Sequence, residues 1–248
     1  IEIEMTNDES IMSFLAYFNQ IDKHLDKVLG DDGFAPYNEK LKKVAEGRFS
    51  ITNFIRKHIY QLRNMGELRN FITHGIKTNG ETYAIPTQAA LEKIRQYAEI
   101  IIEPPKVGQV FRKEVFTAKT SDLISDIIPL MKKHSYTHIP IYDEKGVFVG
   151  VLSESRLLHW IADAVIENHY ANFELLKVEH CPLDQESDFI FVSKEMSIYE
   201  ADLYFTEKKL KNQKFDVMFI TEMGDSESQL LGMITSSDAN VIDQYLIF

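Results

Sequence analysis

The chain has 248 residues, of which 44% are hydrophobic and 11% aromatic, and it carries a net charge of −11. This composition can fill one large core or two modest ones, and it excludes wholesale disorder. No apolar run approaches the roughly 20 residues that a membrane span needs, and no basic stretch followed by an apolar one opens the chain, so we expect neither a span nor a secretion signal. The single cysteine, Cys181, excludes an internal disulfide and a multi-cysteine zinc site and favours a cytoplasmic location.

The charge is distributed unevenly along the chain. Residues 112–248 hold 23 acidic and 13 basic residues, whereas residues 1–111 hold 15 and 14. Within the first part, residues 48–77 contain six Lys or Arg against one acid, Glu67. A basic cluster in an acidic protein favours a polyanion partner such as RNA, and the alternative is an ordinary solvated helix face.

Four helices are predicted in the first hundred residues, because apolar residues recur there three and four positions apart. Their ranges are 8–29, 38–46, 50–75 and 87–102. Ser50 is a suitable N-cap for the third helix, and Gly75 is a suitable residue just after its end. The sequence EPPKVG at residues 103–108 then stops the helical pattern and is typical of a linker.

Short β-rich runs alternate with helices in the second half of the chain. Strands are predicted at 115–117, 139–142, 147–152, 189–192, 217–221 and 230–234, and helices at 122–134, 155–176, 197–211 and from 237 onward. The order strand, helix, strand, strand, helix therefore occurs twice, which indicates an internal repeat. Residues 136–143 align with 215–222, and 150–153 align with 232–235. The spacing drifts only at a helix end and in a hairpin turn, where insertions are tolerated.

The predicted fold class is α+β, with an N-terminal all-α helical bundle followed by two β-α-β-β-α repeats. We place the helical domain at residues 1–103, a linker at 104–109, the first repeat at 110–180 and the second at 181–248.

The repeats resemble CBS (cystathionine β-synthase) domains, and two in tandem resemble a Bateman module. The resemblance covers roughly residues 110–248 and rests on HIPIYDEKGVFVGVLSESR at 138–156, FDVMFITE at 215–222 and LLGMITSSD at 230–238. The hydroxyl of Thr235 can cap the next helix and reach a ligand, and the helix N-terminus favours phosphate. The carboxylate of Asp238, one turn later, can accept both hydroxyls of a ribose.

This resemblance implies that Thr235 and Asp238 hold the ribose of an adenosine-containing ligand and that adenine lies between the strands. The residues expected to line the base pockets are Ala118, Thr137, Ile139, Pro140, Ser193, Asp216 and Met218. The alternative is that Thr235 and Asp238 are only an N-cap and a first-turn acid. AMP, ATP, a cyclic dinucleotide and S-adenosylmethionine are all candidate regulatory ligands, because each presents an adenosine; no cofactor or metal is required.

The first half-site departs from this pattern. Ser153 keeps the hydroxyl, but Arg156 stands where the second repeat has its carboxylate. A guanidinium cannot accept hydrogen bonds from ribose, although it can bind a phosphate through two donors. We therefore expect this half-site either to be empty or to face the phosphates of a ligand held by the other.

The end of the third helix carries the sequence LRNFITHG, residues 68–75. On a straight helix Arg69 falls on the apolar face of Leu62, so it needs an acidic partner, for which Asp22 and Asp26 are candidates, or an anionic ligand. His74 falls about 140° away from Arg69 at 100° per residue.

The pattern Arg-Asn-x-x-x-His in a helical domain resembles the HEPN (higher eukaryotes and prokaryotes nucleotide-binding) family, over roughly residues 6–103. Many members are metal-independent endoribonucleases that act as dimers. The resemblance implies a catalytic set of Arg69, Asn70 and His74: His74 as general base toward a ribose 2′-OH, Arg69 stabilising charge on the phosphate, and Asn70 orienting either group. Because Arg69 and His74 diverge, a second copy would be needed to close the site.

The sequence therefore predicts a cytoplasmic regulatory homodimer in which the repeat pair senses an adenine nucleotide and modulates the helical domain. The alternative is a nucleotide-gated endoribonuclease, with RNA bound by the basic 48–77 helix. Two further alternatives for the helical domain are non-catalytic binding of a nucleotide or RNA and a pure scaffold. The eight histidines show no metal-binding pattern.

Overall fold

The computed structural model describes residues 6–30, 35–75, 84–166, 175–184, 188–211 and 215–245. The chain divides into two compact units. The helical unit comprises Ile1–Pro105, Ser197–Leu203 and Ile242–Phe248, and the repeat unit comprises Lys106–Met196 and Tyr204–Val241. The predicted boundaries between domains thus stay predictions, since one helix of the second repeat is divided between the two units.

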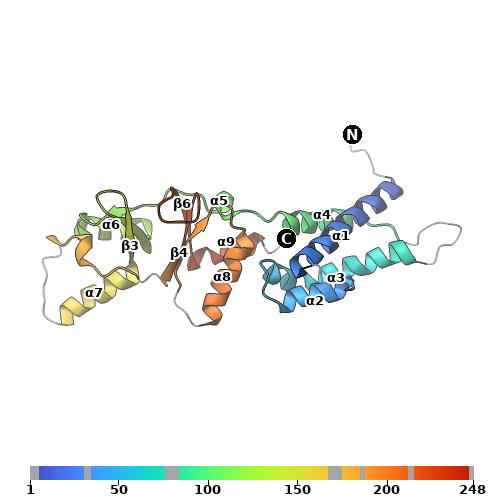
Figure 1. Cartoon of the computed structure of the whole chain (residues 1–248), viewed down its shortest axis with the longest axis horizontal. Helices are drawn as coiled ribbons and strands as arrows, with labels where there is room; N and C mark the ends of the chain where they lie inside the picture. The colour runs from blue at the N-terminus through green and yellow to red at the C-terminus, as the bar shows by residue number, and fades with distance from the viewer. Residues whose placement is uncertain are drawn as a thin grey trace. The chain divides into compact units, whose positions relative to one another are not determined.

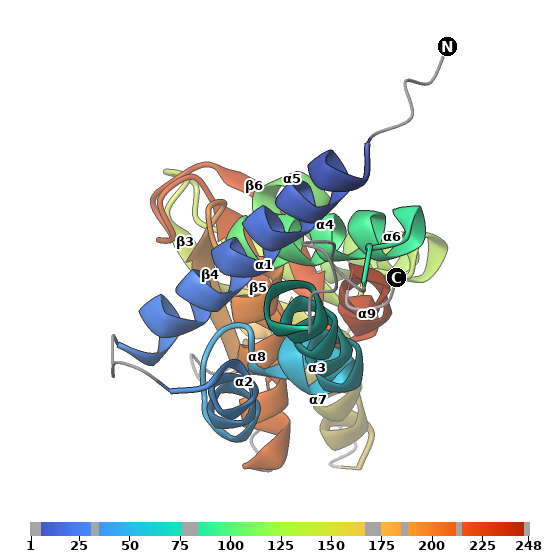
Figure 2. The same ribbon diagram turned by 90° about the vertical axis from the view of Figure 1, so that its right-hand side faces the viewer.

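The four helices predicted for the helical unit are present. They are α1 (Asn7–Leu29), α2 (Tyr37–Glu46), α3 (Thr52–His74) and α4 (Gln88–Ile102). Helix α1 packs along α4, and α2 packs along α3 (Figure 1). In the turned view α2 and α3 are seen nearly end-on while α1 runs obliquely past them (Figure 2). Each helix buries one apolar stripe, as the spacing predicts.

The two ends of α1 show why this helix forms. Thr6 accepts a hydrogen bond from the backbone N–H of Glu9, and the Glu9 carboxylate accepts one from the backbone N–H of Thr6, which is a capping box. Gly30 ends the helix in the left-handed region, at φ 81°, and its N–H bonds back to Asp26 and Lys27. Between them Phe14, Ile21 and Leu25 are fully buried.

The ends of α3 differ in detail from the prediction. Its N-cap is Ile51 rather than Ser50, and no side chain caps it. The hydroxyl of Thr52 instead accepts from the N–H of Phe49 at 2.9 Å and donates to the carbonyl of Val44 at 2.9 Å, so it joins α3 to the end of α2. Gly75 caps the C-terminus with extended backbone, φ −55° and ψ 142°.

The core of the helical unit includes a residue from far along the chain. Phe54 of α3 is fully buried, and its ring lies 5.3 Å from that of Tyr199 and 4.6 Å from that of His58. Tyr199 belongs to α8 (Ile198–Leu210) of the second repeat. Asn53 donates to Asp202 of the same helix at 2.5 Å. The first turns of α8 are therefore part of this core.

The repeat unit contains two small sheets of the same design. In the first, β1 (Ala118–Lys119) pairs in parallel with β2 (His138–Tyr142), which pairs antiparallel with β3 (Phe148–Ser153). In the second, β4 (Phe189–Ser193), β5 (Val217–Thr221) and β6 (Leu230–Thr235) pair in the same order and senses. Helices α6 (Ile124–His134) and α8 connect the parallel pairs, and α7 (Glu154–Ile166) and α9 (Ala239–Tyr245) follow β3 and β6. The α+β class and the internal repeat are confirmed.

The register places corresponding residues at the same points of the two sheets. His138 pairs with Ser153 at the end of β3, and Val217 pairs with Thr235 at the end of β6. Ser153 and Thr235 therefore occupy equivalent positions, each just before a helical turn.

Three predicted elements need correction. The first strand lies at Ala118–Lys119 instead of 115–117, because the chain before it bonds to β6 through the bridge between Arg112 and Gly232. Residues Val107–Val110, in the predicted linker, form a short helix, α5. The helix predicted at 155–176 is described to Ile166 as α7, and Leu176 is not helical; residues 167–174 lie outside the described residues.

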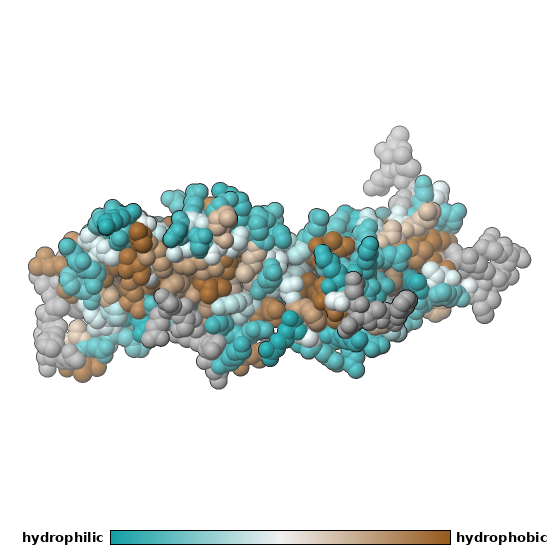
Figure 3. Space-filling model, in the orientation of Figure 1, coloured by the Kyte–Doolittle hydropathy of each residue, from teal (hydrophilic) through white to brown (hydrophobic). Residues whose placement is uncertain are grey.

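Separate apolar clusters lie within the repeat unit. The first contains Ile124, Ile127, Ile139, Leu152 and others of the first repeat. The second contains Val151 with Phe189, Phe219 and Met233, so β3 joins the core of the other repeat. Apolar side chains reach the surface over β3 and β4 in the view of Figure 3. Val147 and Val149 are among the exposed apolar residues of the repeat unit. None of the described helices is long and apolar enough to cross a membrane.

Candidate functional site

A cavity of about 240 Å³ in the repeat unit contains the two residues predicted to hold a ribose. Thr235 and Asp238 line it from the end of β6 and the turn that follows. Other lining residues come from the segment before β1 and from residues 134–138, between the end of α6 and the start of β2. The lining residues are Lys113, Glu114, Val115, Phe116, His134, Ser135, Tyr136, Thr137, His138, Met233, Thr235, Ser237 and Asp238. Both repeats therefore contribute to one cavity.

Asp238 is held in place by Thr235. Its Oδ2 atom accepts from the backbone N–H of Thr235 at 2.7 Å and from the Thr235 hydroxyl at 2.9 Å. The Thr235 hydroxyl also lies 2.7 Å from that of Ser237. Every hydrogen bond that the described residues make to Asp238 uses Oδ2, so Oδ1 keeps its lone pairs for a donor in the cavity, such as a sugar hydroxyl.

Stacked rings form one wall of the cavity. The rings of Phe116 and Tyr136 lie 5.6 Å apart and are tilted by 7°, and those of His134 and Tyr136 lie 5.2 Å apart and are tilted by 15°. Flat π surfaces of this kind bind planar heterocycles. The wall is thus suited to a nucleobase.

Two of the lining residues, Lys113 and His138, lie near carboxylates. Lys113 Nζ lies 3.9 Å from Asp238 Oδ2 and is about half exposed. His138 Nε2 lies 3.8 Å from Asp216 Oδ2, which belongs to the other repeat. The Lys113 ammonium can reach an anionic group of a ligand while Asp238 faces its hydroxyls.

Only part of the predicted site lines this cavity. Thr137, Thr235 and Asp238 do. Ala118 and Ile139 pack in the core of the first repeat, and Met218 is fully buried in β5. Pro140 is buried in β2, Ser193 donates to the carbonyl of Glu222, and Asp216 faces His138. Their roles as base-pocket residues stay predictions.

The first half-site is occupied by the chain's own carboxylates. Ser153, which is 1% exposed, donates to Asp184 Oδ1 at 2.7 Å. Arg156 Nε lies 3.3 Å from the same oxygen, and Arg156 Nη2 lies 3.6 Å from Asp188 Oδ2. Both aspartates are buried. Arg156 is thus already paired, a third arrangement beside the empty and phosphate-facing ones expected from the sequence.

Several lining residues were not foreseen from the sequence. Phe116, Tyr136 and Lys113 lie outside the hairpin pattern that pointed to Thr235 and Asp238. Tyr136 could have been found, because it directly precedes Thr137 at the entrance to β2. Lys113 and Phe116 carry no such signal, since their position depends on the bridge to β6.

The motif residues of α3 lie together, contrary to the helical-wheel expectation. Arg69 Nη1 donates to Asn70 Oδ1 at 3.3 Å and lies 3.2 Å from His74 Nε2. The prediction that Arg69 and His74 diverge is wrong, because the long arginine side chain spans the 140° between their positions. A second chain is therefore not needed to bring these two groups together.

The acids considered as partners of Arg69 have another partner. Asp22 and Asp26 both accept from Lys40, at 2.8 Å and 2.7 Å. Burial by itself would lower the pKa of Lys40, but the hydrogen bonds from its ammonium to the two carboxylates raise it above the ordinary value. Arg69 instead lies over the ring of Phe18, 5.9 Å from its centroid.

One family model matches part of the chain. The family model of the CBS domain matches residues 107–163, and the second repeat has the same strand order as the first. No curated protein matches the chain.

Three solved structures illustrate the similarity. CBSX2 in complex with AMP is 17% identical, with 56% of this chain and 96% of that chain covered and a TM-score of 0.40. The CBS domain pair of MJ0100, in complex with 5′-methylthioadenosine and S-adenosyl-L-methionine, is 20% identical. The match covers 57% of this chain and 97% of that chain, with a TM-score of 0.40. The CBS domain of a CBS domain containing membrane protein from Sphaerobacter thermophilus is 15% identical. The match covers 62% of this chain and 98% of that chain, with a TM-score of 0.42.

Proposed function

We propose that the repeat unit binds one adenosine-containing small molecule in the cavity at Thr235 and Asp238, and that the chain is a regulatory protein that responds to this ligand. One observation carries the proposal: the hydroxyl and carboxylate predicted from the repeat pattern lie in a cavity that also has a stacked aromatic wall. The volume of about 240 Å³ lies below the range of about 300–1,000 Å³ that is usual for small-molecule sites. A single nucleoside or mononucleotide therefore fits better than a dinucleotide.

The chemistry of the lining assigns a part of the ligand to each group. Asp238 Oδ1 accepts from the ribose hydroxyls, since Oδ2 is engaged by Thr235. The rings of Phe116 and Tyr136 face the base, and Lys113 faces a phosphate or another anionic substituent. The paired Arg156 and Asp184 keep the first half-site from taking a second ligand. We therefore propose one ligand per chain.

Titration calorimetry of the full chain tests this function. AMP, ATP, 5′-methylthioadenosine, S-adenosylmethionine and a cyclic dinucleotide are the probes. At least one is expected to bind with a stoichiometry of one, and Asp238→Asn is expected to weaken it about tenfold or more, since a carboxylate hydrogen bond is lost. Asp163→Asn removes an exposed acid of α7 and is the matched control. Equal binding by both variants, or binding of none of the probes, refutes the proposal.

The contact between Arg69 and His74 favours a second candidate function, a metal-independent endoribonuclease in the helical unit. Arg69 Nη1 lies 3.2 Å from His74 Nε2, so a phosphate that separates the two would have its negative charge stabilised by Arg69 and leave His74 to take the proton of a 2′-OH. Cleavage of single-stranded RNA in the presence of EDTA, abolished in Arg69→Ala and in His74→Ala, is the expected result. The endoribonuclease proposal is contradicted if RNA stays intact after incubation with the folded protein, whether monomeric or dimeric, both with and without AMP.

A further inference from the structure

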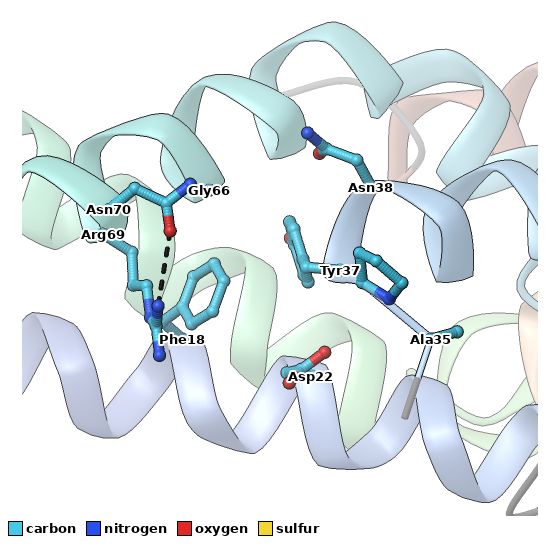
Figure 4. Close-up of a pocket in the computed structure, with 9 residues that line it drawn as sticks. Phe18, Asp22, Ala35, Tyr37, Asn38, Gly66, Arg69 and Asn70 are labelled. Atoms are coloured by element: carbon cyan, nitrogen blue, oxygen red, sulfur yellow. Dashed lines mark hydrogen bonds between the residues drawn. The ribbon is translucent and has the colours of Figure 1, made fainter. Parts of the chain in front are cut away.

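We infer that a second cavity, enclosed by α1, α2 and α3 of the helical unit, is a binding site for a small molecule with one oxyanion group, a carboxylate or a phosphate. The cavity has a volume of about 350 Å³. The lining residues that matter here are Phe18, Asp22, Tyr37, Asn38, Arg69 and Asn70 (Figure 4). It shares no residue with the cavity at Thr235, so the inference does not depend on the nucleotide binding proposed there. It does use Arg69, which the proposed endoribonuclease also uses.

Two buried donors at this cavity lack partners among the described residues. They are Arg69 Nε and the hydroxyl of Tyr37. A buried donor without an acceptor is costly, and a guanidinium without a counter-charge is more so. In the same cavity Arg69 approaches α1 beside Phe18, and the ring of Tyr37 lies between α1 and α3 (Figure 4). Both donors belong to residues that line the cavity, so a bound acceptor can pair with either one after a small rotation of that side chain.

Helix α2 adds backbone donors at the same place. The helix has ten residues, its N-cap is Pro36, and no side chain accepts from its first N–H groups. The first N–H groups of a helix have no partners within the helix, and they form the positive end of its dipole. Tyr37 and Asn38, the first two residues of α2, both line the cavity. Every one of these features favours an acceptor with negative charge.

The one carboxylate of the cavity does not neutralise Arg69. Asp22 accepts from Lys40 at 2.8 Å, and Lys40 also holds Asp26. No acidic side chain of the described residues forms an ion pair with Arg69. Because Asp22 and Asp26 share one ammonium, their cluster keeps one negative charge, which offsets the charge of Arg69 without contacting it. A single oxyanion group is therefore the complement of the Arg69 donors and not of a net positive cavity, and Phe18 and Tyr37 supply an apolar surface for the rest of the molecule.

The position of Tyr37 is fixed by Gly66 of α3. A Cβ atom at Gly66 would lie 2.9 Å from Cδ1 of Tyr37 and 3.2 Å from its Cε1, so only glycine lets the ring pack against the α3 backbone. Burial raises the pKa of Tyr37, and the negative charge of Asp22 raises it further. The phenol therefore stays protonated at neutral pH and remains a donor.

Nuclear magnetic resonance of the full chain tests the site through the Arg69 Nε–H signal, which Arg69→Gln identifies by deleting it. Sodium phosphate and sodium acetate are added separately, with sodium chloride at equal ionic strength as reference. We expect a saturable shift with phosphate, acetate or both, which distinguishes the two sources of the oxyanion. No saturable shift with either salt overturns the inference.

Three variants make the test specific. Tyr37→Phe keeps the ring and removes the unpaired hydroxyl, so it is expected to fold at least as stably while its dissociation constant for the anion rises several-fold. Arg63→Gln removes an exposed cation of the same helix, and Lys113→Gln removes the cation of the other cavity; both are expected to leave the dissociation constant unchanged. A constant unchanged in Tyr37→Phe, or raised equally in Arg63→Gln, overturns the inference.

Discussion

Asp184 accepts a hydrogen bond from the strand-end hydroxyl of the first repeat, as Asp238 does in the second. In the second repeat a carboxylate three residues after the strand end bonds to the hydroxyl of Thr235. In the first repeat that position holds Arg156. The equivalent hydroxyl, that of Ser153, donates instead to Asp184, which lies 31 residues after Ser153 in the chain. The side chain of Asp184 is 1% exposed, and it contacts both the Ser153 hydroxyl and the Arg156 guanidinium.

Asp184→Ala is therefore expected to destabilise the repeat unit. The change leaves the half-buried Arg156 and the buried Ser153 hydroxyl without their acceptor. The expected loss is about 3 kcal/mol in the free energy of unfolding, measured by urea denaturation. Asp163→Ala, at an exposed position of α7, is the control and is expected to lose less than about 0.5 kcal/mol. Equal losses for both variants would show that the contacts of Asp184 add nothing measurable to the free energy of unfolding.

Cys181 is expected to be an unreactive thiol in the folded chain. It packs in the core of the first repeat, and burial raises its pKa to about 11. Since a free thiol has a pKa of about 8.5, the folded state keeps its proton at a pH where the unfolded state loses it. Stability is therefore expected to fall as the pH rises from about 8.5 to 11. Alkylation by iodoacetamide at pH 8 should be at least about 100-fold slower than in urea; comparable rates would contradict this.

At the scale of elements, the close packing of α2 on α3 depends on one helical glycine. A glycine within a helix costs about 1 kcal/mol relative to alanine, so its place at Gly66 needs a packing reason. The 2.9 Å approach of Tyr37 supplies one. The same packing closes one side of the cavity in which Tyr37 and Arg69 lie.

Gly66→Ala is expected to destabilise the helical unit even though alanine is the better helix former. Overpacking costs about 1–3 kcal/mol, which exceeds the gain in helix propensity of about 1 kcal/mol. The free energy of unfolding is the measurement. Asn64→Ala, at an exposed position of the same helix, isolates the propensity effect and is expected to be neutral or slightly stabilising. A stabilised Gly66→Ala would mean that the α2–α3 packing relaxes without cost.

The helices of the first hundred residues could be predicted, because their apolar stripes and caps are local signals that the sequence carries directly. The repeat could be predicted for the same reason, and it placed Thr235 and Asp238 at a strand end before a helical turn. Strand β1 and the lining residues Lys113 and Phe116 could not, since the chain there is positioned by Gly232, more than a hundred residues away. Neither could Asp184, whose segment has no counterpart in the repeat pattern.

At the scale of the whole chain, α8 belongs to both compact units. Its residues Ser197–Leu203 group with the helical unit and those from Tyr204 group with the repeat unit. Tyr199, which is 1% exposed, packs on Phe54 of the helical core. One turn further, Tyr204 packs on Phe215 of the repeat unit. The linker composition at 104–109 predicts a simple division there, because composition is local and the Tyr199 contact is not.

Substitution at these two tyrosines is expected to affect different units. Tyr199→Ala should remove about 3 kcal/mol from the helical unit, as for a buried aromatic residue, and should speed hydrogen exchange in the peptides of α3. Tyr204→Ala, in the same helix, is the matched control and should leave exchange in α3 unchanged while speeding it in β5. Faster exchange in α3 for both variants, to the same extent, would contradict the division of α8.

The pairing of Arg156 with Asp184 also limits how the two repeats can exchange sequence. If recombination copied the second repeat's aspartate into position 156, a carboxylate would replace the guanidinium that now contacts Asp184 and Asp188. Copying in the other direction would set a guanidinium beside Lys113. Each repeat therefore has a charge pattern that does not fit the other repeat when one residue is exchanged. We expect a single exchange of this kind to lower the stability of the repeat that receives it.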